Sequence, residues 1–189
     1  MKRILQNINI LFDLTNEELA VLEQSLKIVT LKKNDLFLEA GTICEQIAFL
    51  ESGCMRLFFD TPKKEACSDF YFENAVVGSF ASFLNKSPSI VNIAAIESCE
   101  LLVLSHNSVM ELTTNYSKLS LLADSIIREQ FLKAEKRESS FLVQSPEERF
   151  KNLLEEHPKI FKRVPLHFIA GYLNITPETL SRYRAKFLV

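Results

Sequence analysis

Residues 166–185 read LHFIAGYLNITPETLSRYRA, a run in which two helical patterns are separated by a turn signal. Asn174 stands at the turn, and asparagine tolerates the left-handed backbone that a tight connection between helices needs. Thr176 is a typical N-cap residue, and Pro177 favours the first position of the helix that follows. The stretch therefore predicts two short helices joined by a tight turn, the arrangement of a helix-turn-helix.

The inward-facing residues of this unit fit a small shared core. Ile169 and Leu173 lie one turn apart on the first helix, and Leu180 and Tyr183 close the core from the second. Ala170 is small at the point where the two helices are expected to cross. A helical hairpin of an interaction module has similar apolar spacing, so this spacing alone leaves both interpretations open.

The charge of the chain is distributed unevenly. The 189-residue sequence has a formal net charge of −2, yet residues 157–189 hold six lysines and arginines against one acid, Glu178. A basic segment behind an acidic remainder is typical of a polyanion contact, and together with the turn and the cap it favours double-stranded DNA. The residues expected to contact DNA from the second helix are Thr176, Glu178, Thr179, Ser181, Arg182 and Lys186.

The first half of the chain has a different pattern. A short helix with a capping box of Thr15 and Glu18 comes first. From Ile28 to Leu104, short runs of β-branched and aromatic residues alternate with turn signals, which predicts a jelly roll or barrel. The expected strands are 28–32, 46–51, 54–60, 65–72, 90–97 and 99–104.

A long amphipathic helix is expected from about Lys118 to Phe141. Charged residues, among them Lys133 and Arg137, are assigned to its solvent face. Its apolar stripe must pack against either the barrel of the same chain or a second copy, and a coiled-coil-like dimer seam is favoured. The residues expected at that seam are Leu119, Leu122, Ile126, Ile127 and Phe131.

Three regions follow from these patterns. Residues 1–117 are expected to form a β-barrel sensor domain, residues 118–144 the dimerisation helix and linker, and residues 145–189 the helix-turn-helix domain. Ser145 and Pro146 mark the start of the last region, since they are an N-cap residue followed by proline at the first helical position.

Several classes of protein are disfavoured by composition. The chain has no apolar run of membrane-spanning length and no secretory signal pattern, so we expect no membrane contact and a cytoplasmic location. Its four cysteines are scattered without a C-x-x-C pair, which indicates buried thiols. Residues 28–104 contain no histidine, which argues against a metal-dependent barrel enzyme of the cupin type. No catalytic residue, metal site or cofactor is therefore expected.

Residues 175–182, ITPETLSR, resemble the recognition helix of the Crp/Fnr transcription regulators, which carry an E-T-x-S-R-type motif. Gly41-Thr42 and residues 49–53, FLESG, resemble strand-turn elements of the cyclic-nucleotide-binding fold. The resemblance covers nearly the whole chain. It implies an α+β fold with an N-terminal double-stranded β-helix or jelly roll, a long dimerisation helix and a C-terminal helix-turn-helix. It also implies a homodimer that contacts DNA in each half-site through Glu178, Ser181 and Arg182, with RNA polymerase as a further partner.

The effector loop departs from this family pattern. In members that respond to cyclic nucleotides, Gly78 would be followed by a glutamate for the ribose, and an Arg-Ser or Arg-Thr pair would hold the cyclic phosphate. Ser79 and Ser89-Ile90 stand there instead. A cyclic phosphate needs a charge-assisted partner to offset its desolvation, so cyclic AMP and cyclic GMP are not expected to bind.

Another small-molecule effector is expected in the same place. The alternatives to the cyclic nucleotides are a sensor for a neutral or apolar ligand and an interaction module without DNA binding. The sequence specifies neither the effector nor the operator, nor does it separate activation from repression. The residues expected to line the effector pocket are Gly78, Ser79, Phe80, Ala81, Ser89 and Ile90.

Overall fold

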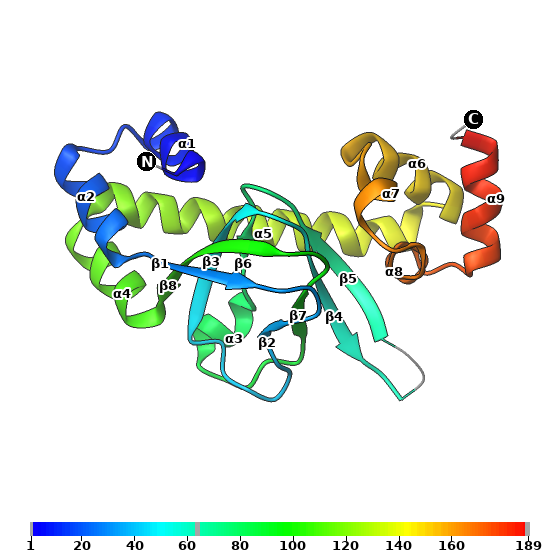
Figure 1. Ribbon diagram of the computed structural model, residues 1–189, viewed down its shortest axis with the longest axis horizontal. Helices are drawn as coiled ribbons and strands as arrows, with labels where there is room; N and C mark the ends of the chain where they lie inside the picture. The colour runs from blue at the N-terminus through cyan, green and yellow to red at the C-terminus, as the bar shows by residue number, and fades with distance from the viewer. Residues whose placement is uncertain (1, 63–64, 188–189) are drawn as a thin grey trace.

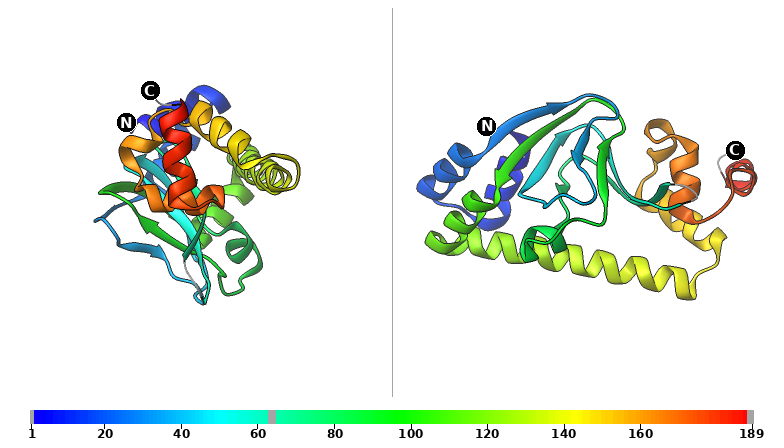
Figure 2. Two further views of the ribbon diagram at one scale, coloured as in Figure 1. Left: turned by 90° about the vertical axis from the view of Figure 1, so that its right-hand side faces the viewer. Right: turned by 90° about the horizontal axis from the view of Figure 1, so that it is seen from below.

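The computed structural model of the protein describes residues 2–62 and 65–187. One long helix runs beneath the β-barrel and connects it to a group of short helices at the far end of the molecule (Figures 1 and 2). The helices are α1 (Arg3–Phe12), α2 (Asn16–Ser25), α3 (Phe80–Asn85), α4 (His106–Asn115), α5 (Ser117–Val143), α6 (Pro146–Glu156), α7 (Ile160–Arg163), α8 (Leu166–Leu173) and α9 (Pro177–Phe187). The strands are β1 (Lys27–Leu31), β2 (Leu36–Leu38), β3 (Gln46–Ser52), β4 (Met55–Asp60), β5 (Glu65–Tyr71), β6 (Val76–Val77), β7 (Asn92–Ala95) and β8 (Cys99–Ser105).

The strands form two antiparallel sheets that enclose the first hydrophobic core. One sheet has the order β1-β8-β3-β6 and the other the order β2-β7-β4-β5, so neighbouring strands are mostly distant in sequence. Side chains such as Leu50, Met55, Ile93 and Leu101 are fully buried between the sheets. The α+β fold with an N-terminal jelly roll, predicted from the strand pattern, is confirmed.

Four elements of the sensor domain were missed in the sequence. Strands β2 and β6 span only three and two residues, too short to show an alternating pattern. Helix α3 occupies the stretch expected to be an effector loop. Helix α1 lacks a side-chain N-cap of its own. Glu51 on β3 accepts hydrogen bonds from the first amides of α1, at 2.9 Å from Arg3 and 3.3 Å from Ile4. This long-range cap has no local sequence signal.

Helix α5 corrects the expected dimer seam. Leu119, Leu122 and Ile126 are 3–8% exposed and belong to the core of their own barrel, so they are not available to a second copy. Ile127 and Phe131 point away from that core and are 39% and 67% exposed. The stripe drifts around the helix because its spacing mixes two faces, and the sequence pattern did not separate them.

The C-terminal helices share a second core with the barrel. Phe150 on α6 is fully buried among α7, α8 and α9, and the same cluster includes Cys67 and Phe70 of β5. Helix α8 packs on β5, where the rings of Tyr172 and Phe70 are 5.2 Å apart. The second core therefore fixes the orientation of the helical domain relative to the barrel.

Two arginines strengthen this domain contact. Arg163 donates to both carboxylate oxygens of Glu73 at 2.8 Å and also pairs with Glu97, both acids being on the barrel side. The guanidinium of Arg56 lies 3.7 Å from the ring centre of Phe58 and 4.0 Å from that of Phe168. Such stacking of a guanidinium between aromatic rings favours a defined docking geometry.

Candidate nucleic-acid interface and effector cavity

Helices α8 and α9 form the expected two-helix unit with the expected turn. Asn174 adopts the left-handed conformation, with φ 53° and ψ 49°. The Thr176 hydroxyl accepts a hydrogen bond from the Thr179 amide at 3.2 Å, which caps α9. Pro177 is the first residue of α9. The turn and the cap predicted from residues 174–177 are therefore confirmed, because both are set by local backbone chemistry.

The core of this unit also matches its sequence prediction. Ile169, Ala170, Leu173 and Leu180 are all no more than 2% exposed. The ring of Tyr183 lies 5.5 Å from that of Phe150, which closes the core from α9. With its inner face fully packed, α9 can present only its opposite face to a ligand.

That opposite face carries the predicted DNA contacts. Thr176, Glu178, Ser181, Arg182 and Lys186 are exposed, whereas Thr179 is half-buried. Helix α9 lies at the outer end of the molecule, with its face turned away from the barrel (Figure 2, left). Hydrogen bonds from its own amide and from the Thr176 hydroxyl hold the pKa of Glu178 below its usual range, so this carboxylate stays ionised at neutral pH.

Two of the basic side chains on α9 differ in their surroundings. Lys186 pairs with Glu147 of α6, with Nζ 3.1 Å from both carboxylate oxygens. Among the described residues no ion pair joins Arg182 to Glu178, although the two lie one helical turn apart. Arg182 is thus available to a ligand, whereas Lys186 must first exchange a carboxylate partner.

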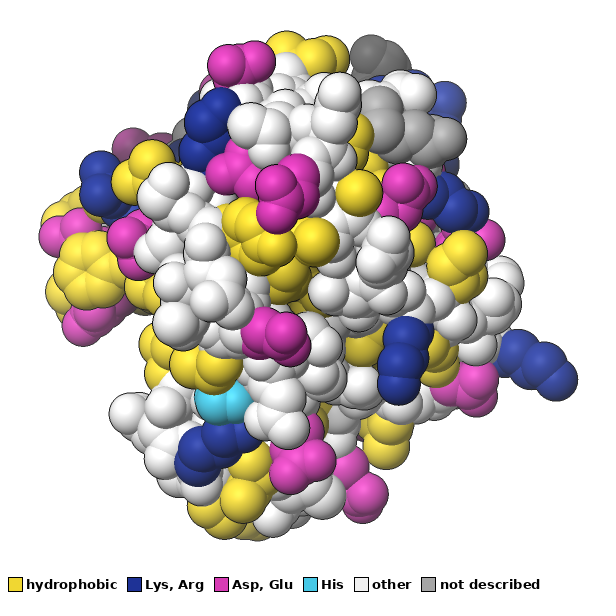
Figure 3. Space-filling view, turned by 90° about the vertical axis from the view of Figure 1, so that its left-hand side faces the viewer, with side chains coloured by type: hydrophobic (Ala, Val, Ile, Leu, Met, Phe, Trp, Pro, Cys, Tyr) yellow, Lys and Arg dark blue, Asp and Glu magenta, His cyan; other side chains and the backbone are white. Residues whose placement is uncertain are grey.

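The other end of the molecule has a mixed surface. Figure 3 views the end formed by α1, α2 and α4, where lysines and arginines alternate with acids and separate hydrophobic patches. Such a mixed face does not create the single-sign potential that a DNA backbone contact requires. The contrast with the exposed face of α9 agrees with the uneven charge of the sequence.

A cavity of about 510 Å³ lies between the barrel, α5 and helices α6 and α8. We refer to it as the interdomain cavity. Five of the six residues expected in an effector pocket line it, namely Gly78, Ser79, Phe80, Ala81 and Ile90. Its volume is within the range of small-molecule sites.

Ser89 is the exception among the expected pocket residues. Its side chain is 3% exposed, and its hydroxyl donates to the carbonyl of Val91 at 2.8 Å and accepts from the Val91 amide at 3.1 Å. It is absent from the lining of the interdomain cavity. The prediction for Ser89 is therefore corrected, because a local turn uses its hydroxyl and turns it inward.

Residues from outside the barrel form the wall of the cavity that sequence reasoning missed. Lys133 and Arg137 of α5 face the barrel and not solvent, as had been expected of them. Arg149 and His157 reach the cavity from the helical domain. Burial lowers the pKa of His157, so the imidazole is neutral at pH 7. The spacing of Gln130, Lys133 and Arg137 along one helix face is the only local signal for this wall.

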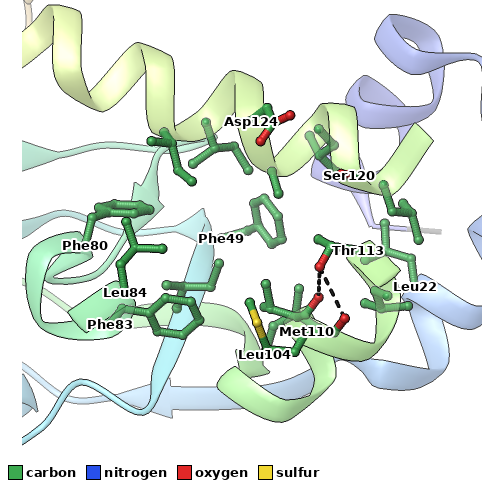
Figure 4. Close-up of a pocket in the computed structure, with 18 residues that line it drawn as sticks. Leu22, Phe49, Phe80, Phe83, Leu84, Leu104, Met110, Thr113, Ser120 and Asp124 are labelled. Carbon is green, nitrogen blue, oxygen red and sulfur yellow. Dashed lines mark hydrogen bonds between the residues drawn. The ribbon is translucent and has the colours of Figure 1, made fainter. Parts of the chain in front are cut away.

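A second, smaller cavity of about 210 Å³ lies between β3 and helices α3, α4 and α5. Its lining is almost entirely apolar and includes Phe49, Phe83 and Leu104, while the Thr113 hydroxyl is bonded to backbone carbonyls of its own helix (Figure 4). Ser120 and Asp124 lie along α5 at its edge (Figure 4). The cavity thus offers apolar packing and few polar partners.

Comparison with known proteins agrees with these observations. Residues 28–116 match the family model of the cyclic nucleotide-binding domain. FixK2 from Bradyrhizobium japonicum aligns with a TM-score of 0.75 at 15% identity, over 86% of this chain and 84% of that one. The chain has the fold of the Crp/Fnr regulators. A Crp/Fnr-family transcriptional regulator from Eubacterium rectale gives 0.72 at 15%, over 93% and 84% of the two chains. A CooA variant from Carboxydothermus hydrogenoformans gives 0.69 at 14%, over 89% and 78%.

The resemblance to the Crp/Fnr family read from the sequence is thereby confirmed at the level of the fold. No curated protein matches the chain. All four cysteines of this Crp/Fnr fold are buried, and burial raises the pKa of the Cys54 and Cys67 thiols to about 12. Within residues 2–62 and 65–187, no helix is long and apolar enough to span a membrane, and no cluster of three metal-binding side chains occurs.

Proposed function

We propose that the protein is a homodimeric, sequence-specific DNA-binding transcription regulator of the Crp/Fnr type, with α9 as its recognition helix. The observation that carries the proposal is the exposed face of α9, where Glu178, Ser181 and Arg182 project from a rigid, capped helix at the outer end of the molecule. A recognition helix reads base edges with the residues of its N-terminal half, and these side chains lie there. RNA polymerase is proposed as a partner on the family resemblance alone.

Selection of binding sites from random duplex DNA tests this function. A dimer of helix-turn-helix units is expected to enrich a palindrome whose half-sites lie about one helical turn apart. Binding that shows no enriched sequence, or no binding at low salt, would contradict a regulator and favour a protein-interaction module. Titration at several salt concentrations separates base recognition from backbone attraction, because only the latter falls steeply with salt.

The proposed dimer seam is a row of exposed residues on α5. Alternating steps of three and four residues connect Asp124, Ile127, Phe131, Ala134 and Glu138, which is the spacing of a coiled-coil contact. All five are exposed, and Ile127 and Phe131 give the row an apolar centre. This seam row lies on a different face of α5 from the residues buried in the barrel, so one helix serves both contacts.

Cyclic AMP and cyclic GMP are expected not to bind. Ser79 stands where a ribose carboxylate would be needed, and the Ser89 hydroxyl is already bonded within its own turn. Lys86 is the only cation of the loop, and it lies exposed at the end of α3. Calorimetry with either nucleotide should give no heat of binding. A micromolar dissociation constant for either one would contradict this prediction.

A further inference from the structure

The interdomain cavity has two chemically different walls. On the barrel side its residues are mainly apolar and include Leu57, Phe59, Phe80 and Ile90. The opposite side is formed by α5 and the helical domain and is rich in charge. Its cations, Lys133, Lys136, Arg137 and Arg149, outnumber the carboxylates of the lining, Asp69 and Glu156.

The two lysines of that wall already have carboxylate partners. Lys133 pairs with Asp69 at 2.7 Å, and Lys136 pairs with Glu156. The arginines differ, because within the described part of the chain neither Arg137 nor Arg149 forms an ion pair. Arg137 donates to the carbonyl of Tyr172 and stacks 3.6 Å from its ring centre. The excess positive charge of the cavity therefore resides on the two guanidiniums.

Arg149 is the less satisfied of the two arginines. It donates to the carbonyls of Gln144 at 2.7 Å and Leu173 at 3.2 Å, and its Nε is buried without a hydrogen-bond partner. Burial lowers the pKa of Arg137, and the nearby charge of Arg149 adds to that shift. Two guanidiniums held close together at the edge of a cavity are costly to keep unless an anion compensates them.

We propose that the interdomain cavity binds an organic carboxylic acid with a flat or branched apolar body, its carboxylate held by Arg137 and Arg149 and its body against the barrel wall. Guanidinium pairs suit a carboxylate, since they donate in a fixed planar geometry. The apolar wall supplies few hydroxyl partners, which disfavours a sugar-bearing ligand. The proposal rests on the proposed regulator function, because such a ligand would touch the barrel, α5 and the DNA-binding domain together and so bias their docking.

A fluorescent anion and its uncharged counterpart test the site in the full-length protein. Anilinonaphthalene sulfonate has an aromatic body and one negative charge, and N-phenylnaphthylamine has nearly the same body without the charge. Arg137→Gln and Arg149→Gln are each expected to weaken the sulfonate about tenfold or more, since each removes a charge-assisted donor, and to leave the amine within about twofold. Lys159→Gln removes an exposed charge of the helical domain outside the cavity and should change neither probe.

Further arms separate the outcomes. Ala81→Trp fills the cavity from the barrel side without altering an arginine, so it should weaken both probes. Benzoate and phenylacetate should displace the sulfonate, whereas benzamide, phenylacetamide and cyclic AMP should not. Sulfonate binding that is indifferent to both arginine variants overturns the proposal, and equal losses of both probes in those variants would show a purely structural role. DNA binding is measured separately, so a protein that binds the acids but no DNA contradicts only the regulator function.

Discussion

Replacement of Ile127 by aspartate is expected to convert the dimer into monomers and to weaken DNA binding about a hundredfold or more. Ile127 is at the centre of the seam row and is 39% exposed in the single chain, so its side chain contributes little to the barrel core. In a dimer, the new carboxylate would be buried opposite its symmetry mate, at a cost of several kcal/mol. Loss of the second half-site contact removes the gain that linked binding provides. Light scattering gives the mass, and titration of labelled operator gives the affinity.

Two further variants isolate the seam from the stability of the chain. Leu132 is also large, apolar and exposed, at 55%, but it lies about 100° around α5 from Phe131, outside the seam row. Leu132→Asp should therefore remain dimeric. Ile126→Asp places a charge in the barrel core and should lower the melting temperature of the monomer itself. An intact dimer in the Ile127→Asp variant, or monomers in both Ile127→Asp and Leu132→Asp, would show that α5 pairs differently.

Local chemistry explains why the C-terminal unit was predictable from sequence. The boundaries of α8 and α9 depend on Asn174, Thr176 and Pro177, each of which acts on backbone within a few residues of itself. The same holds for α2 and α6, whose capping boxes are formed by residues three apart. Features of this range leave a complete signal in the sequence.

Long-range packing explains what the sequence did not reveal. Residues such as Leu119 and Ile126 have the spacing of a seam and of a core alike, and only the position of the barrel decides between them. The cationic wall of the interdomain cavity is more extreme. Arg137 and Arg149 lie far from Gly78 in sequence, and they meet the effector loop only because α8 docks on β5. No motif around Gly78 records that contact.

Replacement of Arg182 by alanine is expected to cost about 1–3 kcal/mol of binding free energy per half-site and to relax base preference at one position. Arg182 is exposed on α9 one turn beyond Glu178, so both side chains can enter the major groove together. There Arg182 can donate two hydrogen bonds to a guanine, while the ionised Glu178 accepts from a cytosine. Since no ion pair ties Arg182 to Glu178 within the described residues, the guanidinium need not leave a protein partner first.

Lys186→Ala provides the matched control on the same helix, because it removes a phosphate contact and no base contact. It should weaken binding evenly across sequences and reduce the salt slope by about one unit. The loss should be smaller than for Arg182, because Lys186 must give up Glu147, an exposed pair worth at most about 1 kcal/mol. Site selection followed by titration of both variants over a range of salt concentrations distinguishes them. Wild-type affinity and sequence preference in Arg182→Ala would mean that α9 does not read bases through this residue, whereas an even loss across sequences would make Arg182 a phosphate contact.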